Sequence, residues 1–119
     1  MEERVLEAIE IARLAVEIAS DKQADNIVML DTKETCSFAD YFVICSGDSS
    51  RQVEAIWREI CEVLKRGSII PYHVEGTADS GWVLVDLGEV IVHIFTSPLR
   101  DYYQLDSLWS QAIPIIRLQ

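Results

Sequence analysis

Residues 82–95 read WVLVDLGEVIVHIF, two apolar runs joined by Gly88-Glu89. Branched and aromatic side chains favour β-strands, and glycine followed by an acid in a two-residue gap favours a tight hairpin turn. A two-residue loop would place Val85 opposite Val92. Because side chains alternate along a strand, one face of this hairpin is then purely aliphatic, and we expect it to lie under helices.

The other face of the predicted hairpin has a mixed chemistry. It carries Trp82, Leu84, Asp86, Ile91, His93 and Phe95. A hidden core face rarely combines aromatic, acidic and imidazole groups, because buried polar groups need partners. This face is therefore the first candidate for a functional surface.

The charge pattern draws attention to the same region. The chain has no Lys or Arg between Arg66 and Arg100, and the acids in this stretch are Glu75, Asp79, Asp86 and Glu89. A surface built from it would repel nucleic acid and attract a basic partner. The alternative interpretation is a solvated acidic surface that keeps the protein soluble.

Length and composition predict one globular domain. The chain has 119 residues, half of them hydrophobic, and a net charge of −10. This length fits a single domain spanning residues 1–119. The negative charge argues against direct binding to DNA or RNA, and no apolar run is long enough to span a membrane.

The cysteines and histidines predict no metal site. Cys36, Cys45 and Cys61 have no zinc-type spacing, and His73 and His93 lack a suitably spaced third ligand. We expect Cys45 and Cys61 to be small buried hydrophobes and Cys36 to be exposed in a polar segment. Free thiols without a signal peptide predict a cytosolic protein.

Hydrophobic periodicity predicts an α/β fold with the order α-β-β-α-β-β-β-α, a mixed sheet with helices packed on one face. The expected elements are a helix over 2–20, strands at 26–31 and 41–46, a helix over 49–66, an extended segment at 68–74, the hairpin, and a short helix from 97. The strand at 41–46, the 49–66 helix and the next strand should form a crossover. Pro114 should end helical order, leaving an apolar tail over 112–119 that packs on the first helix or helps to form a homodimer.

The turn Ser46-Gly47-Asp48-Ser49-Ser50 lies between a predicted strand and the start of a helix. Phosphates bind at such places, so a nucleotide site is one hypothesis, and a tight turn with a helix cap is the other. A nucleotidyl-transferring enzyme would also need two carboxylates one residue apart on the next strand to hold metal ions. Asp86 stands alone there, although a hydrogen bond from His93 to Asp86 is conceivable.

Four segments together carry a resemblance to a known family. They are ADYFVICSGDSSRQVEAI (39–56), VEG (74–76), GWVLVDLGEVIVHIF (81–95) and R-x-Y-Y-x-L-x-x-LW (100–109). In this order they resemble the ribosomal silencing factor family, also called the Iojap-related family. The resemblance covers nearly the whole chain.

The resemblance implies a fold similar to nucleotidyltransferases without an established catalytic activity, and no cofactor. It also implies binding to the large ribosomal subunit through its protein number fourteen, which blocks joining of the small subunit and lowers translation when nutrients are scarce. The family's partner contacts include the Trp and Leu of a W-x-x-x-D-L segment, which map to Trp82 and Leu87 with Asp86 between them. We add Glu75 and Glu89 as acidic neighbours, and a nucleotide-binding enzyme using Ser46–Ser50 and Asp86 remains the alternative.

Overall fold

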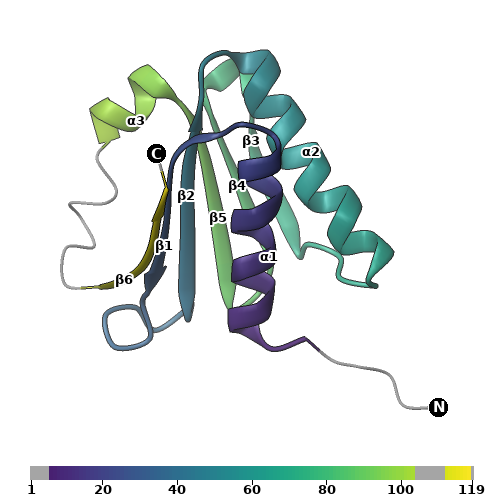
Figure 1. Ribbon diagram of the computed structural model, residues 1–119, viewed down its shortest axis with the longest axis vertical. Coiled ribbons are helices and arrows are strands. Elements are labelled where there is room, and N and C mark those ends of the chain that lie inside the picture. Colours follow the sequence, from purple (N-terminus) through teal and green to yellow (C-terminus); the bar gives the residue numbers. More distant parts are fainter. Residues whose placement is uncertain (1–5, 104–111, 119) are drawn as a thin grey trace.

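The structure is a computed structural model that describes residues 6–103 and 112–118. Within them the chain forms α1 (Ala8–Asp21), β1 (Asp25–Asp31), β2 (Tyr41–Gly47), α2 (Ser50–Arg66), β3 (His73–Thr77), the 3-10 turn η1 (Ala78–Ser80), β4 (Trp82–Asp86), β5 (Val90–Thr96), α3 (Ser97–Tyr103) and β6 (Ile113–Leu118). The predicted α/β class, with a mixed sheet and helices packed on it, is confirmed (Figure 1).

The sheet has the strand order β3-β4-β5-β2-β1-β6. The predicted hairpin register is confirmed, with Val85 opposite Val92 and Val83 opposite Ile94. The predicted crossover needs a correction, because the parallel neighbour of β2 is β5 and not the next strand, β3. β3 instead pairs antiparallel with β4 and forms one edge of the sheet.

The aliphatic face of the hairpin packs under α1 and α2, as expected (Figure 1). The core stripe of α2 is fully buried at Val53, Ile56, Ile60 and Leu64, while Trp57 and Cys61 on the same side are half-buried. The helix begins after Ser49, whose Oγ accepts a hydrogen bond from the Gln52 N–H at 3.2 Å. Burying these side chains against the strands fixes α2 across β4 and β5.

α3 lies on the opposite side of the sheet, so the prediction that all helices cover one face was wrong for this helix. Leu99 packs with Trp82 and Leu84, away from α1 and α2. Arg100, nearly buried, donates from Nη1 to the backbone O of Asn26 at 2.6 Å and to Ser46 Oγ at 3.0 Å. These contacts hold α3 over the ends of β1 and β2.

The apolar tail forms a strand that was not predicted. β6 pairs antiparallel with β1, and Ile116 lies opposite Met29. Pro114 lies inside β6, at the point where the register shifts between Met29 and Leu30. A register shift at an edge strand tolerates a residue without an N–H. The homodimer stays a prediction.

Two further boundaries differ from the sequence expectations. α1 begins at Ala8, and residues 2–5 of the helix predicted over 2–20 lie outside the described part. The extended segment at 68–74 becomes regular only near its end, where Tyr72 N–H donates to Asp86 O at 2.8 Å. Pro71 has no N–H, so pairing starts after it. The short helix predicted from 97 is α3, which the structure describes as far as Tyr103.

Cys36 is buried, at 8% exposure, which corrects the expectation that it would be exposed. The loop around it folds back on itself, because Thr32 Oγ1 donates to Ala39 O at 2.9 Å and Cys36 N–H donates to Thr32 O. Cys36 thereby joins the apolar cluster around Phe42. In the described ranges, no helix is long and apolar enough to cross a membrane.

Candidate functional site

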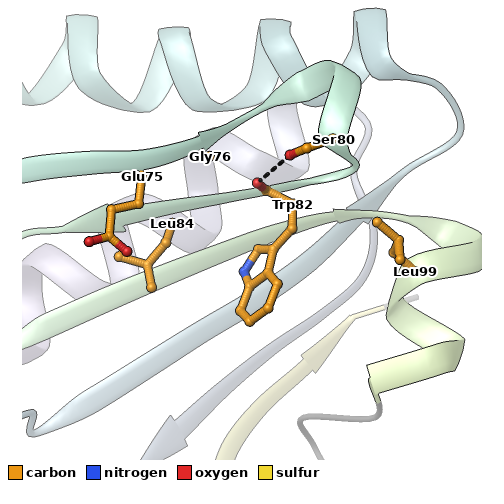
Figure 2. Close-up of a pocket in the computed structure, with 6 residues that line it drawn as sticks. All are labelled: Glu75, Gly76, Ser80, Trp82, Leu84 and Leu99. Atoms are coloured by element: carbon orange, nitrogen blue, oxygen red, sulfur yellow. Dashed lines mark hydrogen bonds between the residues drawn. The ribbon is translucent and has the colours of Figure 1, made fainter.

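A pocket of about 390 Å³ opens on the sheet face opposite α1 and α2. Its lining residues come from β3, η1, β4 and α3: Glu75, Gly76, Ser80, Trp82, Leu84 and Leu99. Figure 2 shows the indole of Trp82 between Leu84 on one side and Leu99 on the other. We call this site the Trp82 pocket.

The η1 turn sets the start of β4 and so the position of Trp82. Thr77 Oγ1 accepts from the Ser80 N–H, and Ser80 Oγ donates to Thr77 O at 2.7 Å. Ser80 Oγ also lies 3.3 Å from Trp82 O (Figure 2). Gly81 follows with φ of 87°, a left-handed conformation that favours glycine. The short polar segment between β3 and β4 thus fixes the backbone of Trp82 and places its side chain in the pocket.

Two residues of β5, Phe95 and His93, hold the indole of Trp82 in place. Its ring stacks on Phe95 with centroids 4.9 Å apart and an interplanar angle of 30°. Its Nε1–H donates to His93 Nδ1 at 3.3 Å. Trp82 is half-buried, so one part of the ring is anchored in the sheet and another part faces the pocket.

His93 and Asp86 do not bond to each other. His93 accepts the Trp82 N–H, and burial lowers the pKa of its imidazole to about 4, so the ring is neutral near pH 7. Asp86 Oδ1 accepts the Gly88 N–H at 2.8 Å and holds the hairpin turn, while Oδ2 lies 3.6 Å from His73 Nδ1. In place of the His93–Asp86 hydrogen bond that the sequence allowed, His93 bonds to Trp82, and Asp86 interacts with Gly88 and His73.

Of the other predicted contact residues, Glu75 lies at the pocket, whereas Leu87 and Glu89 lie away from it. Glu75 is exposed at the rim of the pocket, opposite Leu84. Leu87 is 8% exposed and packs in the core under the helices, while Glu89 is exposed in the turn. The β4–β5 pairing shows no bulge that would re-aim either strand. Leu87 therefore lies five residues, roughly 17 Å, along the strand from Trp82 and on the opposite face.

Sequence reasoning missed four residues of this site: Gly76, Ser80, His93 as a partner of Trp82, and Leu99. The register held a usable signal for His93. It pairs with Leu84, which places it diagonal to both Trp82 and Asp86. Leu99 had no such signal, because nothing in the sequence indicated that α3 crosses to this face.

The Ser46–Ser50 turn is poorly suited to a phosphate. The Asp48 N–H is already bonded to Gln52 Oε1 at 2.6 Å, one residue earlier than a capping box requires. Asp48 also hydrogen-bonds to the side chain of Asp25 and thereby raises the pKa of the Asp25 carboxyl. A neighbouring acid pair repels phosphate, so the local electrostatics favour the interpretation as a helix cap.

Among the residues that the structure describes, no group of three or more His, Cys, Asp or Glu side chains could hold a metal ion. The chemistry that the Trp82 pocket offers is instead that of a binding surface: an aromatic floor, aliphatic walls at Leu84 and Leu99, and a carboxylate at the rim. Such a combination of an aromatic anchor and a charged rim is typical of protein interfaces.

Comparisons with known proteins agree over nearly the full length. The family described as ribosomal silencing factor during starvation matches residues 5–119. The ribosomal silencing factor of Halalkalibacterium halodurans is 41% identical over 110 residues, 92% of this chain and 93% of its own. That of Bacillus subtilis is 43% identical over 102 residues, 86% of each chain.

Two further similarities extend the comparison. A crystal structure of a protein from Chromobacterium violaceum superposes with a TM-score of 0.85 at 36% identity, covering 88% of both chains. A mouse protein named mitochondrial assembly of ribosomal large subunit protein 1 is 28% identical over 100 residues, 82% of this chain and 44% of its own. Because the family model matches residues 5–119, and two bacterial silencing factors are 41% and 43% identical to this chain, it belongs to the ribosomal silencing factor family.

Proposed function

We propose that this protein binds the large ribosomal subunit through its protein number fourteen, blocks joining of the small subunit and lowers translation when nutrients are scarce. The observation that carries the proposal is the Trp82 pocket, a half-buried indole in a region without basic residues. The role is one of binding and not of catalysis, and it is exerted in the cytoplasm, where ribosomes work.

Charge supports a ribosomal partner. The segment between Arg66 and Arg100 contributes Glu75 at the pocket rim, Asp79 in η1 and Asp86 at the end of β4. A ribosomal protein that lies on RNA phosphates is expected to be basic, so its free surface is complementary to these acids. Complementary charge speeds encounter and selects the partner, while the apolar pocket supplies the contact area.

The names of relatives support the same subunit. The bacterial relatives are called silencing factors, and the more distant mouse relative is named for assembly of the large ribosomal subunit. These names describe those proteins. For this chain they favour a partner on the large subunit over a small-molecule substrate.

The proposed contact surface has two parts. Trp82, Glu75 and Asp86 form the first part, on the open face of the sheet. Leu87 and Glu89 form the second, at the hairpin turn, where Glu89 is exposed and Leu87 is mostly covered. We expect the first part to supply most of the affinity, because truncating a buried aromatic anchor costs about 2 kcal/mol or more of binding free energy.

Co-sedimentation with isolated large subunits tests the proposal. Wild type should travel with the subunit, and Trp82→Ala should bind about 30-fold more weakly. Trp57→Ala is the matched control, because Trp57 is another half-buried indole but lies in α2, on the helix side of the sheet. Equal loss in both variants would indicate unfolding, and an unaffected Trp82→Ala would show that the contact face is wrong.

A joining assay then tests the consequence of binding. Small subunits are added to large subunits preincubated with the protein, and the yield of joined ribosomes is measured by light scattering. Wild type should reduce the yield, and Trp82→Ala should restore it. Binding without any effect on joining would contradict the proposed silencing mechanism.

A further inference from the structure

The buried imidazole of His93 has an unusual hydrogen-bonding state. It is 6% exposed and lies on β5, with Leu84 opposite it on β4 and Ile44 opposite it on β2. Nδ1 accepts the Trp82 Nε1–H, whereas Nε2 has no partner among the residues that the structure describes. A buried polar atom left unpaired costs free energy, so its presence here calls for a physical reason.

The tautomer follows from the Trp82 contact. An indole nitrogen only donates, so the imidazole nitrogen facing it must be the unprotonated acceptor. In the neutral ring the proton then sits on Nε2, the atom without a partner. An apolar side chain would fill the same space without an unpaired N–H but would offer Trp82 no acceptor.

We propose that His93 is the positioning residue of the Trp82 pocket: its Nδ1 accepts the indole N–H, so that Trp82 lies on Phe95 and presents hydrocarbon, not a hydrogen-bond donor, to its partner. The stack on Phe95 and the bond to His93 fix the ring at two points. This inference rests on the proposed function, and it specifies the partner chemistry: an apolar group covers the indole, and no acceptor is required from the partner.

The geometry explains why the acceptor must come from inside the protein. A partner that had to supply an acceptor to a half-buried indole would have to place it accurately while excluding water. With the N–H already satisfied, the exposed part of the ring behaves as a flat apolar surface between Leu84 and Leu99 (Figure 2). Burial of that surface by a partner then favours binding and leaves no hydrogen-bond donor unpaired.

Nuclear magnetic resonance of the free protein tests the pairing directly. The Trp82 indole signal is assigned with Trp82→Phe, and its hydrogen exchange is compared with that of Trp57. The Trp82 N–H should exchange slowly in wild type and at least about tenfold faster in His93→Leu, which removes the acceptor at similar volume. His93→Asn, whose side-chain oxygen can occupy the Nδ1 position, should restore slow exchange. Nitrogen-15 spectra of the imidazole should place the proton on Nε2.

Binding to large subunits is then measured for the same variants. His93→Leu should bind about tenfold more weakly than wild type, and His93→Asn should recover most of the affinity. Circular dichroism must show that both are folded. If His93 had a purely structural role, the affinity of each variant for the large subunit would follow its folding stability, whether or not the new side chain accepts a hydrogen bond.

The outcomes separate this inference from the proposed function. Fast exchange of the wild-type Trp82 N–H, or a proton on Nδ1, overturns the inference whatever the ribosome does. Slow exchange together with normal subunit binding by Trp82→Ala overturns the proposed function and leaves the Trp82–His93 pair standing. Loss of binding in Trp82→Ala with undiminished binding in His93→Leu shows that the pair does not position the contact.

Discussion

Gly81 and Leu99 pack so closely that a Cβ on residue 81 would overlap Leu99 Cδ1 and lie 2.9 Å from Thr96 Oγ1. The close approach joins the end of η1 to α3 and forms one wall of the Trp82 pocket. Gly81→Ala should therefore displace Leu99 and strain a backbone at φ of 87°. We expect a loss of about 2 kcal/mol of unfolding free energy, measured by urea denaturation.

Gly67→Ala is the matched control for that change. Gly67 follows α2 with φ of −92°, and a Cβ there would meet only Leu64 O at 3.5 Å. This substitution should alter stability by less than about 1 kcal/mol. Similar losses in both variants would contradict the close packing of Gly81 against Leu99.

Stability should depend on the ionisation of His93. Burial lowers the pKa of His93 from 6.5 to about 4. Below pH 6.5 His93 takes up a proton in the unfolded chain but not in the folded chain. The contribution of the neutral His93 to the free energy of unfolding is therefore fully present above pH 6.5 and is lost as the pH falls toward 4. Linkage predicts a loss of about 2 kcal/mol between pH 7 and pH 5 from this group.

His93→Asn provides the reference for the pH experiment, since asparagine does not titrate. Urea denaturation at pH 7, 6 and 5 should show a smaller decline for the variant than for wild type. Most acids of the chain affect both proteins alike, so the difference between the two curves isolates His93. Parallel curves would mean that the imidazole is more accessible to protons than its burial suggests.

The cysteines should differ in their reactivity toward alkylating reagents. Burial raises the pKa of the Cys45 thiol to about 12 and also raises that of Cys61, which is only half-buried. Because the thiolate is the reactive form, native protein at pH 8 should be alkylated at Cys61 before Cys45. Mass spectrometry of digested samples reads the order, and urea should make all three cysteines react.

Mutation of Leu87 should mainly lower the stability of the protein, whereas mutation of Glu89 should mainly weaken binding. Leu87→Ala removes a side chain that packs under the helices and should cost about 2 to 3 kcal/mol of unfolding free energy. Glu89→Lys changes an exposed charge, so it should leave stability within about 0.5 kcal/mol and weaken ribosome binding at low salt. Unchanged binding by Glu89→Lys would remove the hairpin turn from the proposed contact surface.

The central hairpin was predictable because several local signals agree. The Gly88-Glu89 gap, the β-branched runs and the alternation of faces all specify the register that places Val85 opposite Val92. The cap of α2 by Ser49 was predictable for the same reason. Such features depend on residues close together in the sequence.

The missed features depend on distant contacts. β6 is a strand because β1 offers it an edge, and Pro114 alone suggested only the end of a helix. α3 covers the open face because Leu99 meets Trp82 and because Arg100 reaches Asn26 and Ser46. The partner of His93 depends on the direction of two side chains, which register alone leaves undecided between Trp82 and Asp86.

The parallel pairing of β2 with β5 has a consequence for how the protein is made. Tyr41 lies opposite Val90, and the connection between the two strands contains α2, β3 and β4. During synthesis the central pair therefore forms only after most of the chain has emerged, and the pocket gains its Leu99 wall later still. We expect products truncated before β5 to lack both the central strand pair and the Trp82 pocket.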